Sequence, residues 1–307
     1  MPGPPLKLTS VELEQRLDDF VASYLQDKSP ETIGTYRRAL NEFQRWFVGQ
    51  RPRFLFRVED IEAYKQYLMK TRGLHQVSVS TYLTALRRFA QYLVDAGLLE
   101  ENPARAVKGN RRPSTHSRAV LTESEIDRLF RAVDASHPIG IRDEAIIFAM
   151  LYAGLSEIEI VRADVEDLEQ TLLGWYLRVQ GKGHQVKDQQ VVLDPQVMNK
   201  IKAYLDTRSR LKPSDPLFAS HGHRSEGERL NTRSVRSRIR HHLMAAKIRR
   251  KGITPHSLTH TAALIWLNDG LSVEEVKQRM RHGTLDTTMI YLRKKGLLKR
   301  RGTEVDA

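Results

Sequence analysis

The sequence predicts a mainly α-helical protein with one small β-hairpin, an α+β fold divided into two domains. Three observations support this prediction. Apolar residues recur at helical spacing through most of both halves of the 307-residue chain. Residues 172–194 instead alternate between apolar and polar positions, as half-buried strands do. Between the halves, residues 102–120 ("NPARAVKGNRRPSTHSRAV") contain two prolines, no acidic residue and no apolar period, which predicts a linker.

We therefore place a helical domain at residues 1–107, a basic linker at 108–120 and a second domain at 121–307. The length is sufficient for a core in each domain. Lys and Arg total 50 against 37 Asp and Glu, a formal net charge of +13. This excess favours a polyanionic partner, because cations that neutralise phosphates release condensed counterions. A basic protein without such a partner would have the same composition.

The composition also excludes several classes of protein. The chain has no cysteine, which excludes disulfides and thiolate metal sites. Its longest apolar run, residues 145–155, is too short to span a bilayer, so we expect a buried helix there and no membrane partner. The first ten residues lack the basic start and apolar centre of a signal peptide. We expect a cytoplasmic protein associated with the nucleoid.

Two long helices are expected to dominate the first domain. The first begins in "SPETIGTYRRALNEFQRWF", with Ser29 as its N-cap and Pro30 at the first helical position. The second is "SVSTYLTALRRFAQYLVDAGLL", with Gly97 as its stop, and a shorter helix at residues 58–70 lies between them. The aromatic residues of these helices should form the core. The apolar stripe of the first helix contains Ile33, Tyr36, Leu40, Phe43 and Phe47.

Basic side chains outside these stripes are candidate contacts to a DNA backbone. Those on the helices lie beside the apolar stripes, and those of the linker suit a strap across a nucleic acid. A solvated surface is the alternative for all of them. The candidates are Arg37, Arg38, Arg87, Arg88, Arg105, Arg111, Arg112 and Arg118.

The second domain begins with a capping box, Thr122 with Glu125, which starts a helix. An apolar helix at about residues 141–153 should be central, because it has few polar faces. The alternating stretch predicts two strands joined by a turn near residues 181–183. Further helices are expected at about residues 195–208, 231–246, 256–268, 273–281 and 284–293.

Two positions in the second domain combine ordinary structure with possible chemistry. Lys182 lies between two glycines at the expected turn; such a lysine is ordinarily solvated, but a flexible tip can also bring an ammonium to a leaving oxygen. His256 and His260 share one helix face. Their spacing also suits zinc, but Ser257 replaces the glutamate of HExxH and no third ligand is evident, so we expect no metal site. His260 precedes an apolar run and can equally be a structural histidine.

The segment "RHGTLDTTMIYLR" places His282 nine residues before Tyr291. A tyrosine on a short helix ordinarily packs in the core. As a nucleophile, a phenol needs cations that stabilise its anion, because it titrates at about pH 10. A functional Tyr291 therefore predicts a positively charged pocket.

The order of these motifs resembles that of the tyrosine recombinases, or phage-integrase family, in a compact Xer-like layout. The similar segments of the second half are "YAGLSEIEIVRADVEDL", "VQGKGHQ" and "TPHSLTHTAALIWLNDGLSVEEVKQRMRHGTLDTTMIYL". In the first half, the two long helices resemble the helical core-binding domain of the family. The resemblance covers nearly the whole chain and implies a two-domain, C-shaped clamp around duplex DNA.

The resemblance also implies a mechanism that needs no metal or nucleotide cofactor. A tyrosine attacks the scissile phosphate and leaves a 3′-phosphotyrosyl link, while a hairpin lysine protonates the departing 5′-oxygen. Two arginines and two histidines hold the non-bridging oxygens. By position, the nucleophile, the lysine, the two histidines and a supporting histidine correspond to Tyr291, Lys182, His256, His282 and His260.

Both family arginines are absent from the matching positions. Ser156 stands in "GLS" where the family has "GLR", and Thr259 stands in "HSLTH" where the family has "HxLRH". Arg281 stands where the family usually has glycine before histidine. One placed donor at a developing oxyanion changes a rate by about 10²–10³, and a guanidinium on a phosphate should matter at least as much.

Three hypotheses of function follow. The first is a site-specific duplex-DNA-binding protein of DNA recombination or integration, whose strand cleavage through Tyr291 is absent or strongly impaired. The second is a working recombinase with a rewired clamp, for which Arg281 and Arg162 are the nearest replacement cations. The third is a helical interaction protein that does not bind DNA. On DNA, we expect homo- or hetero-oligomers in which the C-terminal tail packs on a neighbouring protomer.

Overall fold

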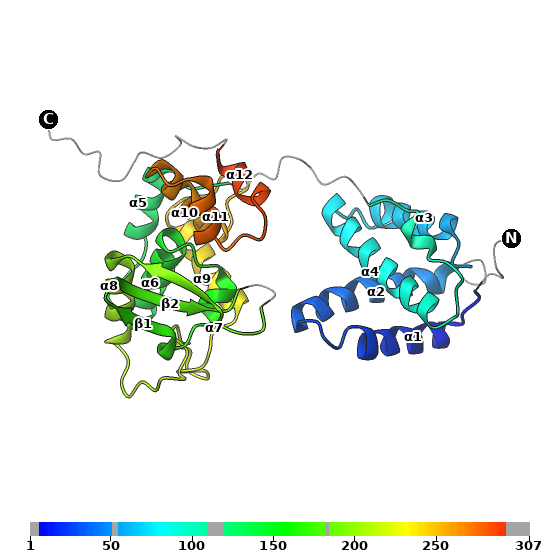
Figure 1. Cartoon of the computed structure of the whole chain (residues 1–307), viewed down its shortest axis with the longest axis horizontal. Coiled ribbons are helices and arrows are strands. Elements are labelled where there is room, and N and C mark those ends of the chain that lie inside the picture. Colours follow the sequence, from blue (N-terminus) through cyan, green and yellow to red (C-terminus); the bar gives the residue numbers. More distant parts are fainter. Residues whose placement is uncertain (1–5, 51–54, 110–118, 182–183, 293–307) are drawn as a thin grey trace. The chain divides into compact units, whose positions relative to one another are not determined.

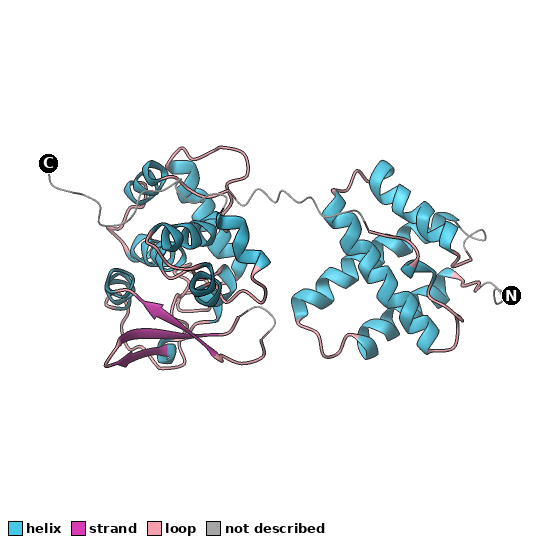
Figure 2. Cartoon of the chain, turned by 45° about the horizontal axis from the view of Figure 1, so that its top comes forward, coloured by secondary structure: helices cyan, strands magenta, loops and turns pink. Residues whose placement is uncertain are grey.

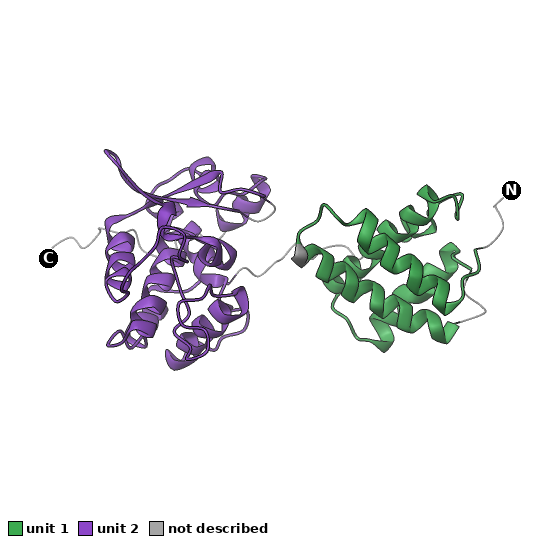
Figure 3. Cartoon of the chain, turned by 90° about the horizontal axis from the view of Figure 1, so that it is seen from below, with its two compact units in different colours: residues 1–116 green, residues 117–307 purple. Residues whose placement is uncertain are grey.

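The computed structural model describes residues 6–50, 55–109, 119–181 and 184–292 of the chain. It forms two compact units, residues 1–116 and 117–307 (Figure 3). The boundary between them lies inside the expected linker, whose Arg111, Arg112 and Arg118 fall outside the described residues. Within the described ranges, no helix is long and apolar enough to cross a membrane.

Unit 1 is built from helices in its described part (Figures 1 and 2). Its two long helices pack against each other, as the apolar stripes predict. Two of its helices continue into short π-helical turns, and one 3-10 turn closes the unit. The segments in chain order are α1 (Ser10–Asp19), η1 (Phe20–Tyr24), α2 (Pro30–Gln50), α3 (Val58–Gln66), η2 (Tyr67–Thr71), α4 (Gln76–Asp95) and η3 (Pro103–Arg105).

Local signals set the ends of the long helices in unit 1. The Thr32 amide donates to the Ser29 hydroxyl over 3.3 Å, so Ser29 caps α2 as expected. Gly97 follows α4 at φ +70°, a conformation that ends a helix and favours glycine. The core between the helices is aromatic, as expected, and contains Phe20, Phe43, Phe47, Phe56, Tyr64 and Phe89.

Residues 102–107, which precede the linker placed at 108–120, pack on unit 1. Ala104 and Val107 are buried in the core of unit 1. The Arg87 guanidinium donates to the carbonyl oxygens of Ala104, at 3.0 Å, and Val107, at 2.6 Å. These residues are therefore anchored to α4 rather than forming part of a solvated strap. At the other end, Val120 is buried in unit 2.

Unit 2 combines eight described helices with one small sheet (Figures 1 and 2). The Thr122 capping box starts its first helix, as predicted, because the Glu125 amide donates to the threonine hydroxyl and the Glu125 carboxylate accepts from the Thr122 amide. The helices are α5 (Glu123–Arg131), α6 (Pro138–Tyr152), α7 (Glu157–Arg162), α8 (Pro195–Leu205), α9 (Thr232–Ala245), α10 (Ser257–Asn268), α11 (Val273–Arg279) and α12 (Asp286–Leu292).

The sheet has three antiparallel strands in the order β1-β2-β3. The predicted pair is present as β2 (Gly174–Val179) and β3 (Gln189–Leu193), with Leu177 opposite Val191. The first strand, β1 (Leu168–Thr171), was not predicted. The connection between β2 and β3 is longer than a tight turn, and Lys182 within it lies outside the described residues.

Helix α6 lies at the centre of unit 2, as its apolar sequence predicts. It packs against α8 and α10. The chain leaves α6 through Gly154 at φ +64°, where an added Cβ would lie 2.6 Å from the Trp266 ring of α10. Only glycine fits both constraints. This close approach places the start of α7, at Ser156, next to α10.

Candidate active site

Three histidines and one tyrosine from residues 256–291 meet in unit 2. The rings of His256 and His260, one helical turn apart, have centroids 4.5 Å from each other. The Tyr291 ring lies 5.7 Å from His260 and 6.4 Å from His282, and it is nearly parallel to His282 at 11°. The cluster is formed by α10, α12 and the loop that precedes α12. The structure therefore brings together four of the residues that the sequence singles out.

Tyr291 is fully buried in its own chain, against the apolar residues of α10 and α11. Its hydroxyl lies 2.5 Å from Nδ1 of His260. A neutral His260 with Nδ1 unprotonated can accept the phenolic proton at this distance. The neighbouring His282 is fixed by a 2.8 Å hydrogen bond between Nδ1 and the Thr288 hydroxyl. The Tyr291 hydroxyl thus has a proton acceptor, His260 of the same chain, beside it.

His256 is the most open of the three histidines. Its side chain is half exposed, and Nδ1 lies 3.5 Å from the Glu157 carboxylate. Burial raises the pKa of Glu157, but the hydrogen bond and charge of His256, with the charge of Arg236, outweigh burial and lower this pKa. The anionic Glu157 therefore holds His256 at the start of α10.

The residues at the two expected arginine positions face protein acceptors. The Ser156 hydroxyl donates to Oε2 of Glu159 over 2.8 Å, and its amide donates to the same oxygen. The buried Thr259 hydroxyl donates to the Leu155 carbonyl over 3.0 Å. Neither side chain carries charge, and the proton of each hydroxyl is already committed. These two positions therefore add no cation to the cluster around Tyr291.

Arg281 brings a guanidinium to this region from the loop before His282. Its Nε and Nη2 donate to the two Glu159 carboxylate oxygens at 2.6 and 2.8 Å. Nη2 also donates to the Gly154 carbonyl, and Nη1 donates to the Arg279 carbonyl. The side chain is only 8% exposed, so most of its donors and its charge are taken up inside the protein.

Cations also contact the described residues on either side of Lys182, which itself lies outside the described part of the chain. Nη1 of Arg162 donates to the Gly181 carbonyl over 3.2 Å. On the other side, the Lys187 ammonium pairs with Asp164, at 2.6 Å, and with Asp167. These contacts tie Gly181 to α7 and Lys187 to the turn that precedes β1. Arg162, considered above as a replacement cation, is engaged at this loop.

The predicted DNA-contact residues of unit 1 differ in their environment. Arg37, Arg38, Arg88 and Arg105 are exposed. Arg87 is only partly exposed, and its guanidinium is occupied by the two carbonyls described above. The four exposed side chains are available for a polyanion, and Arg87 has a structural role in addition to any contact with DNA.

Sequence reasoning missed α9 as a basic surface. The helix contains no acidic residue, and Arg233, Arg236 and Arg240 are exposed on it. The sequence "RSVRSRIRHH", which has four arginines and no acidic residue, is the signal that could have revealed it. Arg236 also pairs with Glu157 over 3.3 Å, which connects α9 to the start of α7.

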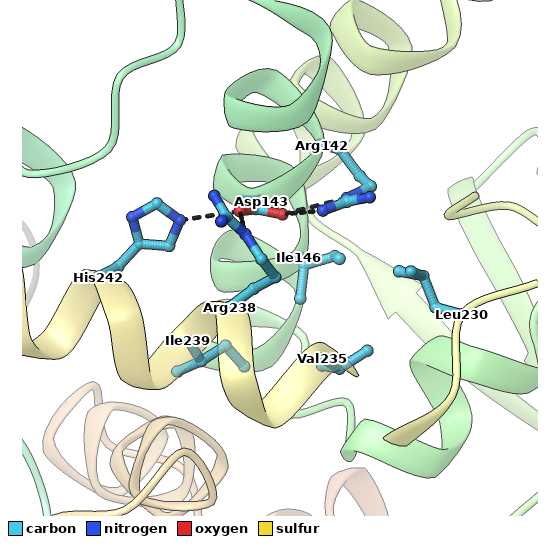
Figure 4. Close-up of a pocket in the computed structure, with 8 residues that line it drawn as sticks. All are labelled: Arg142, Asp143, Ile146, Leu230, Val235, Arg238, Ile239 and His242. Carbon is cyan, nitrogen blue, oxygen red and sulfur yellow. Dashed lines mark hydrogen bonds and ion pairs between the residues drawn. The ribbon is translucent and has the colours of Figure 1, made fainter. Parts of the chain in front are cut away.

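The opposite side of α9 is anchored to α6 through Asp143 (Figure 4). The Asp143 carboxylate accepts from Arg142 at 2.7 Å, from Arg238 at 2.7 Å, and lies 2.9 Å from Nε2 of His242. Burial raises the pKa of Asp143, but the hydrogen bonds of His242, Arg142 and Arg238 and the charge of Arg142 outweigh it and lower the pKa. The ionised carboxylate thus orients the helix.

In the described parts of the chain, no three His, Asp or Glu side chains lie close enough together to hold a metal ion. The paired histidines of α10 are engaged with Glu157 and Tyr291 instead.

This fold, with its tyrosine–histidine cluster, is that of the tyrosine recombinases, in the Xer-like layout that the sequence suggests. The chain belongs to the phage integrase family: the phage integrase family model matches residues 119–296, and the model of the N-terminal SAM-like domain of phage integrases matches residues 15–98. The match covers both units.

Similar proteins cover nearly the whole chain. Tyrosine recombinase XerC of Pelotomaculum thermopropionicum is 28% identical over 291 residues, which cover 90% of this chain and 92% of that protein. Tyrosine recombinase XerD of Proteus mirabilis is 29% identical over 289 residues, which cover 92% and 88%.

Solved structures share the fold. The XerH site-specific recombinase bound to a palindromic difH substrate has a TM-score of 0.72 at 17% identity, covering 94% of this chain and 82% of that one. A lambda integrase dimer bound to a COC′ core site has a TM-score of 0.67 at 15% identity, covering 89% and 96%.

Proposed function

We propose that this protein binds a specific duplex-DNA site and takes part in DNA recombination or integration, with strand cleavage by Tyr291 absent or strongly impaired. Family membership, the net charge of +13 and the DNA-bound state of similar recombinase structures support the first part. On DNA, the protein acts in the cytoplasm, at the nucleoid, as a homo- or hetero-oligomer. Its C-terminal tail, which lies outside the described residues, would contact a neighbouring protomer.

One observation carries the second part of the proposal. The Ser156 hydroxyl donates to Glu159, and the Thr259 hydroxyl donates to the Leu155 carbonyl. The nearby Arg281 guanidinium is paired with the same Glu159 carboxylate.

Attack by Tyr291 would form a phosphorus–phenol oxygen bond and break the bond to the 5′-oxygen. The phenolic proton would pass to a base, and the departing 5′-oxygen would take a proton from a general acid, the role expected for Lys182. Negative charge would grow on the non-bridging oxygens, and none of Ser156, Thr259 and Arg281 offers it an unpaired cation.

The proposal separates binding from cleavage. Many Lys and Arg contacts to phosphates supply affinity, and losing two charges at the cleavage point removes a small share of them. Loss of two clamp arginines should slow cleavage by roughly 10⁴-fold or more if the effects were additive, although groups in one site rarely add. Tight binding with little cleavage suits a regulator of a competent recombinase, or the silent member of a mixed complex.

The experiment that tests this proposal begins by selecting bound duplexes from a random library, because the target sequence is not encoded in any motif. The selected site is then nicked to trap a covalent protein–DNA adduct. We expect a sequence-specific shift without adduct for the natural chain. We expect an adduct for Ser156→Arg/Thr259→Arg, and no adduct when Tyr291→Phe is added to this variant.

The working recombinase with a rewired clamp is the second candidate, because Arg281 places a guanidinium close to Ser156. It predicts an adduct from the natural chain that disappears in Tyr291→Phe. An interaction protein that does not bind DNA predicts no selected duplex at any salt concentration. The same trapping experiment therefore distinguishes the three functions.

A further inference from the structure

Glu159 is a buried carboxylate that needs a counter-charge. It is 4% exposed, and its Oε2 accepts from both the amide and the hydroxyl of Ser156. A buried carboxylate without a cation is strongly destabilising, because its desolvation is not repaid. The capping hydrogen bonds from Ser156 do not neutralise the charge.

The counter-charge comes from Arg281, which lies 122 residues later in the chain. The guanidinium meets both carboxylate oxygens in a bidentate arrangement and is itself buried. The backbone of Arg281 has φ +55°, a region that disfavours side chains with a Cβ. The surrounding contacts hold the residue in this strained conformation.

The side chains of residues 156 and 281 lie close together because both donate to the Glu159 carboxylate. The Ser156 hydroxyl and Nη2 of Arg281 each lie 2.8 Å from the same oxygen of Glu159. The guanidinium is therefore within two hydrogen-bond lengths of the side chain of residue 156. An arginine at 156 would start from the same backbone position and meet a carboxylate whose two oxygens are already occupied.

We propose that Arg281 is a relocated counter-ion: it neutralises Glu159 in place of an arginine at position 156, so that one of the two positions can carry the guanidinium but not both. This inference rests on the proposed function only in taking the family arginine at 156 as its reference. Arg281 is a positioning residue, because it holds Glu159, the start of α7 and the loop of His282 together. Restoring arginine at 156 alone then leaves two guanidiniums competing for one carboxylate.

Thermal unfolding of the full chain tests the coupling. Arg281→Gly relieves the backbone strain but strands Glu159, so we expect its melting temperature to fall by roughly 5 °C or more. Ser156→Arg should also lower it, since the added guanidinium has no free partner. The double variant Ser156→Arg/Arg281→Gly should regain most of the loss. Losses that simply add in the double variant would overturn the proposal.

A matched control is available at Arg210, an exposed arginine that also has φ +55°. Arg210→Gly relieves the same kind of strain without stranding a carboxylate, so it should leave the melting temperature unchanged or raise it. An equal fall in Arg210→Gly and Arg281→Gly would show that the glycine itself, and not Glu159, causes the loss, and would overturn the proposal.

Adduct formation gives a second readout, one that a merely structural role would not move. We expect Ser156→Arg/Thr259→Arg/Arg281→Gly to form adduct at least about tenfold faster than Ser156→Arg/Thr259→Arg, because without the competing guanidinium Glu159 can orient the new arginine, whose remaining donors can then meet the phosphate. Equal rates together with an additive thermal cycle would refute the relocation. A coupled thermal cycle without adduct in either variant would support the relocation and contradict the proposed cause of impaired cleavage.

Discussion

At the scale of single residues, the chemistry of this protein depends on which groups are held inside the protein and which remain available. The Tyr291 hydroxyl is bound to His260, and the Ser156 and Thr259 hydroxyls are bound to Glu159 and Leu155. The polar groups around the tyrosine thus satisfy one another without a phosphate. A protein with these internal hydrogen bonds can bind DNA through other basic residues and still lack the positive charge at Tyr291 that cleavage requires.

The contact between His260 and Tyr291 predicts energetic coupling. His260→Ala removes the partly exposed partner of the buried hydroxyl and should cost about 1–3 kcal/mol of unfolding free energy. Tyr291→Phe should cost less, and the double variant should cost less than the two singles together by about 1 kcal/mol. Urea unfolding measures all three, with exposed His241→Ala as the control. Strictly additive losses would show that the two side chains do not interact.

At the scale of elements, α9 is connected by ion pairs to both α6 and α7. One side is fixed to α6 by Asp143, and Arg236 connects it to α7 through Glu157. The remaining arginines are left exposed. A helix that is firmly anchored on one side and basic on the other suits a rigid contact with a phosphate backbone, because its cations lose little freedom on binding.

The lowered pKa of Asp143 predicts how this anchor depends on pH. The folded-state pKa lies below the ordinary value of 3.8, so its stabilisation is complete above that value and is lost as pH falls through the folded pKa. Asp143→Asn should be less stable at pH 7 by roughly 3–5 kcal/mol, and the difference should shrink below about pH 4. Urea unfolding across pH checks this, with exposed Asp127→Asn as the control. A difference that stays constant down to pH 3 would contradict the assignment.

The exposed side of α9 makes a separate prediction about DNA affinity. Arg233→Ala and Arg240→Ala should each weaken binding to the selected duplex and reduce the slope of log K against log salt by about 0.9. Fluorescence anisotropy over a salt series measures the slope. Arg131→Ala, an exposed arginine at the end of α5, serves as the control. Slopes that match the natural chain in the α9 variants would remove this helix from the interface.

At the scale of the whole molecule, the sequence predicted what depends on local pattern. The helix stripes, the Thr122 capping box, the Ser29 cap and the paired strands β2 and β3 follow from periodicity and short motifs. Strand β1 was missed because its four residues, "LEQT", show no alternation of apolar and polar side chains that would distinguish them from a loop. The 3-10 turn at Pro103 was missed because its packing depends on Arg87.

The site was predictable only in part, for a related reason. Motif order identified the residues that meet around Tyr291, but it did not predict their bonds. The contact of Ser156 with Glu159 is a local capping box, the S-x-x-E pattern of residues 156–159, but the pairing of Arg281 with Glu159 spans 122 residues. Contacts of this kind arise from tertiary packing, so no local pattern encodes them.

The most direct test of the central claim is the single-turnover rate of adduct formation on the selected nicked duplex. The account predicts that Ser156→Arg/Thr259→Arg/Arg281→Gly forms the Tyr291 adduct at least about 10²-fold faster than the natural chain, at equal affinity for the DNA. A natural chain that forms this adduct as fast as the restored variant would contradict it.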